Sequence, residues 1–326
     1  MVTVLLTGCY GEATWVQAPS NGGTETPGTI EGPAPIQLSS FQSITAGLPP
    51  SAAPHASAHF DGALYLAASD GLYALDTGAS SWRTVNLGLS GSLKVTSVTR
   101  VDTSLLVTVA DTAAGKGGAY RLDFGADAFV KLTNAPDAPA WTLARKGSTL
   151  MLATTGGLFV STDRGASWAR KSAALTAPFM QPVQGVWAAS AAQRIFAVAA
   201  DGTLHHSDDD GATWATGLVK GRVTALAAGA SFVLLTSDVE GTLRSDNYGA
   251  TFRPASMDAA AQAFAIVGSR AFAGTANGVR VSDDGGAVWR DASEGLPPGT
   301  SVKTLFAAGP ALIAGSADQV YVAAVE

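Results

Sequence analysis

The stretch SDDDGATW, Ser207 to Trp214, places three aspartates within eight residues. Three similar stretches occur in the same chain: STDRGASW (161–168), SDNYGATF (245–252) and SDDGGAVW (282–289). One such stretch alone is compatible with a metal loop or with a pair of catalytic carboxylates. A protein rarely needs four copies of one active site, whereas a repeated architecture needs the same turn in each unit. The repetition therefore indicates that these aspartates belong to the scaffold.

The repeats share the pattern Ser-x-Asp-x-Gly-x-x-Trp, preceded by a glycine turn and a short apolar strand. Two weaker copies come earlier in the chain, GLYALDTGASSW (71–82) and GAYRLDFGADAF (118–129). The aromatic residues that close the six units are Trp82, Phe129, Trp168, Trp214, Phe252 and Trp289. A period of about 40 residues, with several short strands in each unit, is typical of a β-propeller.

Each unit contains four short apolar strands bounded by glycine and aspartate turns, as in STLMLATTGGLFVSTDRGASWARKS (148–172). After Trp289 only three more strands follow. The missing strand is found near the start of the chain, because SSFQSITAGLPP (39–50) resembles VWRDASEGLPPG (288–299), with Phe41 in the place of Trp289. We therefore predict an all-β, seven-bladed propeller of four-stranded antiparallel blades, whose last blade is closed by the N-terminal strand.

The four clear repeats resemble Asp boxes, the repeats of sialidases, sortilin-type receptors, seven-bladed glycoside hydrolases and a family of photosystem II assembly factors. The resemblance covers residues 39–326 and implies propeller architecture rather than one function. It implies that the aspartate, or Asn247, accepts backbone N–H bonds of its own turn, that glycine supplies a positive φ, and that the aromatic residue fills the gap between blades. The structural residues expected from it are Asp163, Gly165, Trp168, Asp209, Gly211, Trp214, Asn247, Gly249, Phe252, Asp284, Gly286 and Trp289.

The N-terminal segment predicts a lipid-anchored protein of the bacterial cell envelope or a secreted one. Cys9, the single cysteine, follows Leu6, Thr7 and Gly8 and resembles a bacterial lipobox, in which the cysteine becomes the lipidated first residue. Only MVTVLL precedes this motif, so we expect translation to start upstream. Residues 1–9 would be the signal remnant, residues 10–38 a flexible linker rich in Pro, Gly, Thr and Ser, and residues 39–326 the propeller. A lone thiol in a disordered tail is the alternative.

Composition excludes several classes of partner. The net charge is −6 and charged residues make up 14% of the chain, without a run of lysine or arginine. Nucleic-acid binding depends on a dense basic surface, so we do not expect it. No apolar stretch of about 18 residues occurs, so the only membrane contact expected is the lipid anchor. We expect a monomer without cofactor or metal.

The sequence does not contain a recognisable catalytic or metal-binding set. A calcium loop counted from His206 would place histidine at its first position and Gly217 at its twelfth, where acidic ligands are required. His205 and His206 are neighbours in a strand and point to opposite faces, and His55 and His59 are expected to be ordinary strand histidines.

A sialidase is also not expected. The Arg-Ile-Pro signature of that family is absent. Nothing in the sequence pairs Glu240 or Glu294, the glutamates outside the linker and the terminus, with a nucleophilic tyrosine. Related seven-bladed glycoside hydrolases commonly use two propellers with a cleft between them, whereas this chain accounts for one.

Two units are longer than the others, and their extra length predicts the binding face. One insertion lies around Ala110 to Gly118 and the other around Lys171 to Gly185. Propeller connectivity places both loops on the face opposite the repeated turns, and loops on a rigid scaffold are where binding usually occurs. Phe179, Met180 and Trp187 are candidate partner contacts. The alternative is that Phe179 and Met180 fold back onto their blade.

We expect a non-enzymatic binding or scaffold propeller that recognises a protein partner. The alternative is a glycan-binding or glycoside-hydrolase-like protein. The two differ at the central mouth of the ring: clustered carboxylates with an arginine favour glycan chemistry, whereas an apolar, carboxylate-poor mouth favours a protein partner.

Overall fold

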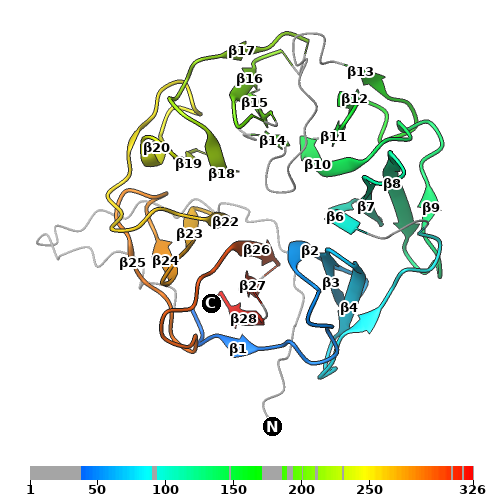
Figure 1. Ribbon diagram of the computed structural model, residues 1–326, viewed down its shortest axis with the longest axis horizontal. Helices are drawn as coiled ribbons and strands as arrows, with labels where there is room; N and C mark the ends of the chain where they lie inside the picture. Colours follow the sequence, from blue (N-terminus) through cyan, green and yellow to red (C-terminus); the bar gives the residue numbers. More distant parts are fainter. Residues whose placement is uncertain are drawn as a thin grey trace, which may run out of the picture.

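The computed structural model describes residues 38–325 except 90–93, 147, 171–185, 189–193, 200, 210–211, 230, 310 and 318. Its strands form seven four-stranded antiparallel sheets arranged as blades around a central axis (Figure 1). The described residues contain no helix. The seven-bladed propeller predicted from the repeats is therefore confirmed.

The blades follow one another in chain order, and each runs from an inner strand to an outer strand. The first contains β2 (Pro54–Phe60), β3 (Ala63–Ala68), β4 (Gly71–Asp76) and β5 (Arg83–Thr84), and the second β6 (Lys94–Val101), β7 (Ser104–Asp111), β8 (Lys116–Asp123) and β9 (Val130–Lys131). The third contains β10 (Ala140–Lys146), β11 (Thr149–Thr154), β12 (Gly157–Ser161) and β13 (Ala169–Arg170), and the fourth β14 (Val186–Ala188), β15 (Ile195–Val198), β16 (Leu204–Ser207) and β17 (Ala215–Thr216). The fifth contains β18 (Val223–Ala228), β19 (Val233–Ser237), β20 (Gly241–Ser245) and β21 (Arg253–Pro254), and the sixth β22 (Ala263–Val267), β23 (Arg270–Thr275), β24 (Gly278–Ser282) and β25 (Arg290–Asp291). The seventh contains β26 (Thr304–Ala308), β27 (Ala311–Gly315), β28 (Val320–Ala324) and β1 (Gln42–Ser43).

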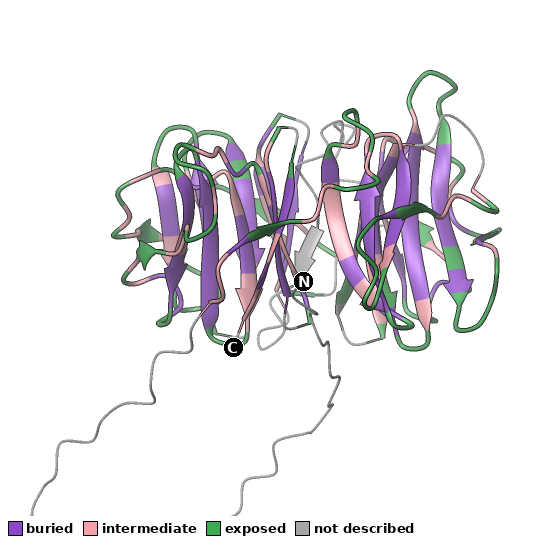
Figure 2. Ribbon diagram, turned by 90° about the horizontal axis from the view of Figure 1, so that it is seen from below, coloured by how far each residue is buried: buried purple, intermediate pink, exposed green. Residues whose placement is uncertain are grey.

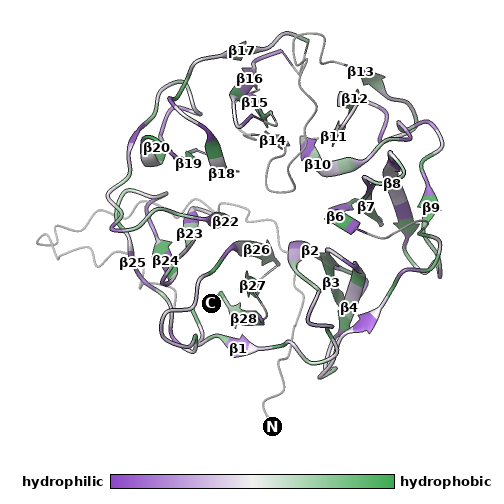
Figure 3. Cartoon of the chain, in the orientation of Figure 1, coloured by the Kyte–Doolittle hydropathy of each residue, from purple (hydrophilic) through white to green (hydrophobic). Residues whose placement is uncertain are grey.

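The hydrophobic core lies between the blades rather than inside any one of them. The second strands are almost wholly buried, whereas the outer strands and the loops are exposed (Figure 2). The apolar residues of the inner three strands (Figure 3) pack into seven clusters. Each cluster joins adjacent blades: Phe60 and Leu72 of the first blade, for example, pack with Val98 and Val107 of the second. A flat blade can bury both faces only in this way.

The seventh blade takes its outer strand from the other end of the chain. Gln42 pairs with Val322 and Ser43 with Tyr321, so β1 lies antiparallel to β28. The backbone N–H of Ile44 donates to the Val320 carbonyl at 2.9 Å and prolongs this pairing. Without β1, the polar backbone edge of β28 would be open to solvent or to another chain.

A second contact closes the ring between the sixth and seventh blades. The backbone N–H of Phe41 donates to the Glu294 carbonyl at 2.7 Å, and the Phe41 side chain is only 3% exposed. Gly295 has φ +87°, and a Cβ added to it would lie 2.2 Å from the Phe41 carbonyl oxygen. In this arrangement, a backbone carbonyl and the positive-φ glycine that follows it both contact the backbone of the next closing aromatic residue. We call it the glycine latch.

The same latch occurs at two interfaces inside the chain. Leu87 and Gly88 hold Phe129 in this way, with an N–H···O distance of 3.0 Å and an added Cβ at 2.1 Å from the Phe129 carbonyl oxygen. Ala46 and Gly47 hold Trp82 in the same way. The Trp82 N–H donates to the Ala46 carbonyl at 2.9 Å, and a Cβ added to Gly47 would lie 2.5 Å from the Trp82 carbonyl oxygen. Phe41 therefore takes the structural place of a closing aromatic residue.

The latch predicts that Gly295→Ala destabilises the ring more than a glycine substitution with the same backbone angle elsewhere. Gly299 is the matched control, because its φ is +75° and nothing lies within 4 Å of an added Cβ. Both variants incur about 1–2 kcal/mol for the left-handed backbone, and only Gly295→Ala adds a steric term of about 1–3 kcal/mol. Urea unfolding measures the difference. Equal losses in the two variants would contradict the latch.

Candidate functional site

The repeated turns connect the third and fourth strands of the third to sixth blades, and each one encloses its own acidic or amide side chain. In the third blade, Asp163 Oδ1 accepts the Ser161 hydroxyl and the Ser167 N–H, both at 2.8 Å, and Oδ2 accepts the Ser167 hydroxyl at 2.5 Å. The N–H of Gly165 donates to the Ser161 hydroxyl at 2.7 Å. The carboxylate therefore forms these hydrogen bonds within its own turn.

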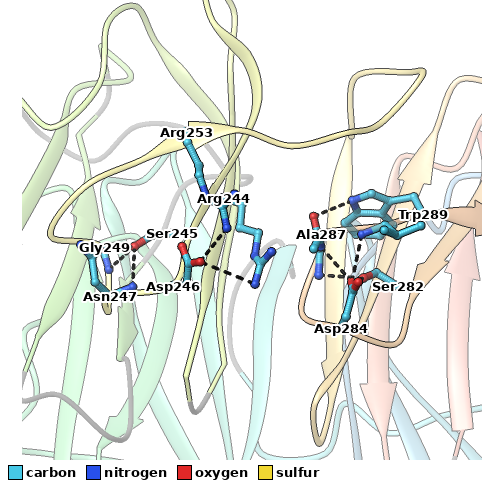
Figure 4. A network of polar contacts seen from close by, with 12 residues as sticks. Arg244, Ser245, Asp246, Asn247, Gly249, Arg253, Ser282, Asp284, Ala287 and Trp289 are labelled. Carbon is cyan, nitrogen blue, oxygen red and sulfur yellow. Dashed lines mark hydrogen bonds and ion pairs between the residues drawn. The ribbon is translucent and has the colours of Figure 1, made fainter. Parts of the chain in front are cut away.

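The other turns repeat this pattern with small changes (Figure 4). Asn247 Oδ1 accepts the Ser245 hydroxyl at 2.8 Å and the Thr251 N–H at 3.0 Å, while its Nδ2 donates to the Thr251 hydroxyl at 2.8 Å. Asp284 Oδ1 accepts two backbone N–H groups, those of Ala287 and Val288. An amide can therefore replace the carboxylate, so the turn depends on hydrogen bonds rather than on charge.

Among the residues that the structure describes, the turn of the fourth blade has the same arrangement of hydrogen bonds. Asp209 Oδ1 accepts the Thr213 N–H at 2.8 Å, and Oδ2 accepts the Thr213 hydroxyl at 2.6 Å. The predicted Gly211 lies outside the described residues. Gly249 and Gly286, in the two following turns, have φ of +77° and +92° and donate N–H to Ser245 and Ser282.

These bonds lower the pKa of the turn aspartates. Hydrogen bonds from the Ser167 hydroxyl and N–H hold the pKa of Asp163 at about 2, and those from Thr213 hold Asp209 at about 2. A carboxylate that is ionised and already bonded to its own turn is not poised to exchange protons with a substrate. Among the described residues, no group of three or more potential metal ligands lies together.

The aspartate that precedes the turn residue forms a different contact, an ion pair with an arginine. Asp208 pairs with Arg194 at 2.6 Å, and Asp283 pairs with Arg270 at 2.6 Å. Asp246 pairs with Arg253 at 2.6 Å and lies 3.9 Å from Arg244 (Figure 4). Because the carboxylates are largely exposed, these pairs contribute about 0–1 kcal/mol each. The three aspartates of SDDDGATW thus include Asp209, which bonds its own turn, and Asp208, which pairs with Arg194 just before β15.

The closing aromatic residues lie over these turns and between blades. The indole N–H of Trp168 donates to the Gly165 carbonyl at 3.2 Å, and that of Trp289 donates to the Gly286 carbonyl at 3.0 Å. Both side chains are half-buried against inter-blade clusters. Trp214 and Phe252 are half-buried in the same way.

Several predicted site residues are not placed by the structure. Cys9, Phe179 and Met180 lie outside the described residues. Trp187 lies in β14, where it pairs with Phe196 of β15, and its side chain is not among those described. The loop predicted around Ala110 to Gly118 is the β7–β8 hairpin, whose tip is exposed.

A cavity of about 230 Å³ lies in the central channel. Its lining comes from six of the seven inner strands or from the residues just before them. The polar lining residues include His55, Thr96, Thr142, Gln262, Lys303 and Thr304, and the apolar ones Leu226, Phe264, Leu305 and Phe306. No aspartate or glutamate occurs among the lining residues that the structure describes. We call this space the channel cavity.

Strand direction places the channel cavity on the face opposite the repeated turns. Its lining residues come mostly from the first half of each inner strand. An inner strand begins where the preceding blade's outer strand ends, on the face that also carries the β7–β8 hairpin. The repeated turns occupy the other face.

Irregular strand starts shape this end of the channel. The register between the first and second strands shifts in four blades, and the extra residues are His55, Thr96, Trp141 and Thr224. Such bulges re-aim side chains and are common next to functional sites. His55 and Thr96 line the channel cavity, and the Thr96 hydroxyl links the second blade to the third through the Ala140 carbonyl at 2.6 Å.

His55 is the titratable group of the cavity with the strongest perturbation. Burial, and then the positive charge of Lys94, lower its pKa to about 4. The imidazole is therefore neutral at physiological pH. Its Nε2 is buried and has no hydrogen-bond partner, and neither has the buried Thr304 hydroxyl. The sequence predicts an ordinary strand histidine at this position. The feature of the sequence that points to the cavity is the recurrence of polar residues at the starts of otherwise apolar inner strands.

Comparison with known proteins places the chain among β-propellers. No model of a known protein family matches it, and no curated protein matches it. A GH74 xyloglucanase from Xanthomonas campestris superposes with TM-score 0.63 at 18% identity over 88% of this chain, which spans about half (53%) of the enzyme. A structure of YCF48 bound to D1 peptide gives 0.65 at 14% identity, covering 89% of this chain and 98% of that one.

The extracellular domain of BT4673 from B. thetaiotaomicron, a putative one-component system, gives TM-score 0.65 at 14% identity, covering 87% of this chain and 39% of that one. At these identities the similarities establish the fold alone. Across the described residues, no helix has the length and apolar character needed to cross a membrane.

The turn geometry predicts that Asp209→Asn removes an acid-sensitive contribution to stability. The folded-state pKa of Asp209, about 2, lies below the usual value for an aspartate, so the bonded carboxylate stabilises the fold above the unfolded pKa, and this contribution is lost as pH falls towards about 2. The asparagine should keep the turn, as Asn247 does.

Urea unfolding at several pH values tests this. The stability difference between the wild type and Asp209→Asn should shrink from about pH 5 to about pH 2.5. Asp61→Asn, in an exposed hairpin turn with φ 47°, is the matched control. A difference that is constant with pH would contradict the assignment.

Proposed function

We propose that this protein is a non-enzymatic binding propeller and that the channel cavity receives a side chain of a protein partner. The observation that carries the proposal is the cavity lining, which combines an apolar wall with neutral polar groups and one cation, Lys303, and contains no carboxylate among the described residues. A mouth that is carboxylate-poor favours a protein partner over glycan hydrolysis.

The size of the cavity supports the same reading. Ligand pockets for small molecules usually measure about 300–1,000 Å³, and the channel cavity, at about 230 Å³, is smaller. It suits one anchoring side chain better than an oligosaccharide. Hot spots of protein interfaces are commonly single side chains in such pockets. One structural neighbour, YCF48, has been solved with a D1 peptide, which supports peptide binding as a use of this architecture.

Glycoside hydrolysis is the second candidate, favoured by the GH74 neighbour. That chemistry commonly needs two carboxyl groups about 5–10 Å apart that flank the bond to be cleaved. The carboxylates of the turns are bonded within their own loops on the opposite face. The channel cavity supplies none among its described lining. Binding without hydrolysis therefore has more support.

A blocking substitution tests the proposed function. Ala263 lines the channel cavity, so Ala263→Trp should fill it and abolish binding of peptides selected from a displayed library against the wild-type protein. Val239→Trp, at an exposed position in the β19–β20 turn on the same face, should leave binding unchanged. Melting temperatures establish that both variants are folded. Selected peptides that bind Ala263→Trp unchanged, or release of reducing sugar from xyloglucan by the wild type, would contradict the proposal.

We further infer that the chain is an Asp-box propeller held at the bacterial cell envelope by lipid on Cys9. The repeated turns and the lipobox-like LLTGC support this, and one structural neighbour is an extracellular domain. Intact-mass analysis of the protein from its native membrane fraction should find a diacylglyceryl-modified N-terminal cysteine. Cys9→Ala should release the protein from that fraction. A membrane-free protein with an unmodified Cys9 would contradict the anchor.

A further inference from the structure

Two lysines flank His55 at the mouth of the channel. Lys303 directly precedes β26, His55 is the second residue of β2, and Lys94 is the first residue of β6. These inner strands belong to three consecutive blades and lie side by side in the ring (Figure 1). Lys303 lines the channel cavity, and the charge of Lys94 acts on the His55 imidazole. Lys303 thus brings a positive charge to the described rim, and His55 is acted on by the positive charge of Lys94 and, more weakly, by the negative charge of Asp70.

Neither lysine forms an ion pair with a carboxylate of the described residues, in contrast to other charged residues of the same face. The ammonium of Lys94 lies 5.6 Å from the centroid of the Trp141 ring, and Lys303 is exposed. Several carboxylates of this face form hydrogen bonds in their own surroundings: Asp137 and Asp258 bond the cations Lys131 and Arg280, and Asp70, Asp111, Asp201, Asp238 and Glu240 bond hydroxyls or backbone N–H groups. Lys303 is the one charged residue of the described cavity lining, and no carboxylate occurs in that lining.

The groups behind the lysines are suited to accept a polar ligand. His55 Nε2 and the Thr304 hydroxyl are buried without partners, and a buried polar group without a partner costs about 1–3 kcal/mol unless a ligand or water satisfies it. The bulge at His55 interrupts the strand register at this residue. Phe264 and Phe306, on the inner strands of the sixth and seventh blades, provide an apolar wall beside these groups.

We propose that the channel mouth recognises a carboxylate carried by an extended segment of the protein partner, with Lys94 and Lys303 as its cationic contacts and the Thr304 hydroxyl as a donor within the cavity. This proposal rests on the proposed function and specifies the partner's anchor. An acidic side chain and a free C-terminus offer the same carboxylate, and an apolar neighbour in the segment packs on Phe264 and Phe306. Charge-assisted bonds in a partly desolvated site are stronger than neutral ones.

The test uses peptides displayed on phage in two formats, one internal and one with free C-termini, selected against the full propeller. An enriched peptide is synthesised with its Glu or Asp changed to Gln or Asn, and separately with its C-terminus amidated. We expect one of these neutral peptides to bind about 10- to 100-fold more weakly. The peptide that weakens identifies the source of the carboxylate.

Protein variants complete the experiment. Lys303→Gln, at an exposed position, and Lys94→Met should each weaken the acidic peptide about tenfold and reduce the salt dependence of its affinity. These two substitutions should not change the affinity of the protein for the matched neutral peptide. Lys220→Met, in the exposed loop between β17 and β18 on the same face, removes the same charge away from the cavity and should leave binding unchanged. Melting temperatures within a few degrees of the wild type should show that the variants are folded.

The outcomes separate this inference from the proposed function. The selected peptides could lack an essential carboxylate, and their binding could be abolished by Ala263→Trp but unchanged by substitution of Lys94 or Lys303. That result would overturn the inference and leave the proposed function standing. Peptides insensitive to all three positions would overturn both. An equal loss on Lys220→Met would also overturn the inference, because it would show a diffuse charge effect on this face rather than recognition at the mouth.

Discussion

The structure depends on the packing of each blade against the next. No single four-stranded sheet can bury both of its faces, and each of the seven clusters joins adjacent blades. The ring is therefore stable only when it is complete, and the last interface is made by residues from both ends of the described chain. Phe41 packs into the cluster of the sixth and seventh blades, while Leu48 packs between the seventh and the first. The N-terminal strand is consequently part of the core and not an appendage to it.

Completion of the ring also determines what the two faces can do. On one face, short turns bond their own aspartate or asparagine, and the aromatic residue that closes each turn packs between blades. A substitution there would change the blade contact itself. On the other face, the residues that start the inner strands contribute their side chains to the channel, and these side chains differ from blade to blade, as His55, Thr96 and Gln262 show. The second face can vary in chemistry without loss of the scaffold.

The sequence was sufficient for the fold because the information that specifies a propeller is local and repeated. The turn pattern marks each unit, and the similarity of residues 39–50 to residues 288–299 predicts the closure seen between β1 and β28. The candidate site could not be found in the same way. Its residues come from six strands distributed over the whole chain, and no two of them form a motif. The bulge at His55 depends on the register between β2 and β3, which apolar patterning does not specify to one residue.

A rigid ring with a fixed cavity has a thermodynamic advantage as a binding site. The lining side chains are carried by inner strands that are hydrogen-bonded to their neighbours, so little conformational entropy is lost when a partner side chain enters. The buried groups without partners in the free protein, His55 Nε2 and the Thr304 hydroxyl, already carry the cost of desolvation. A ligand that satisfies them therefore gains more than it would at a hydrated surface. The stability of the seven blade interfaces allows the channel to hold these polar groups in a buried position without a partner from the protein itself.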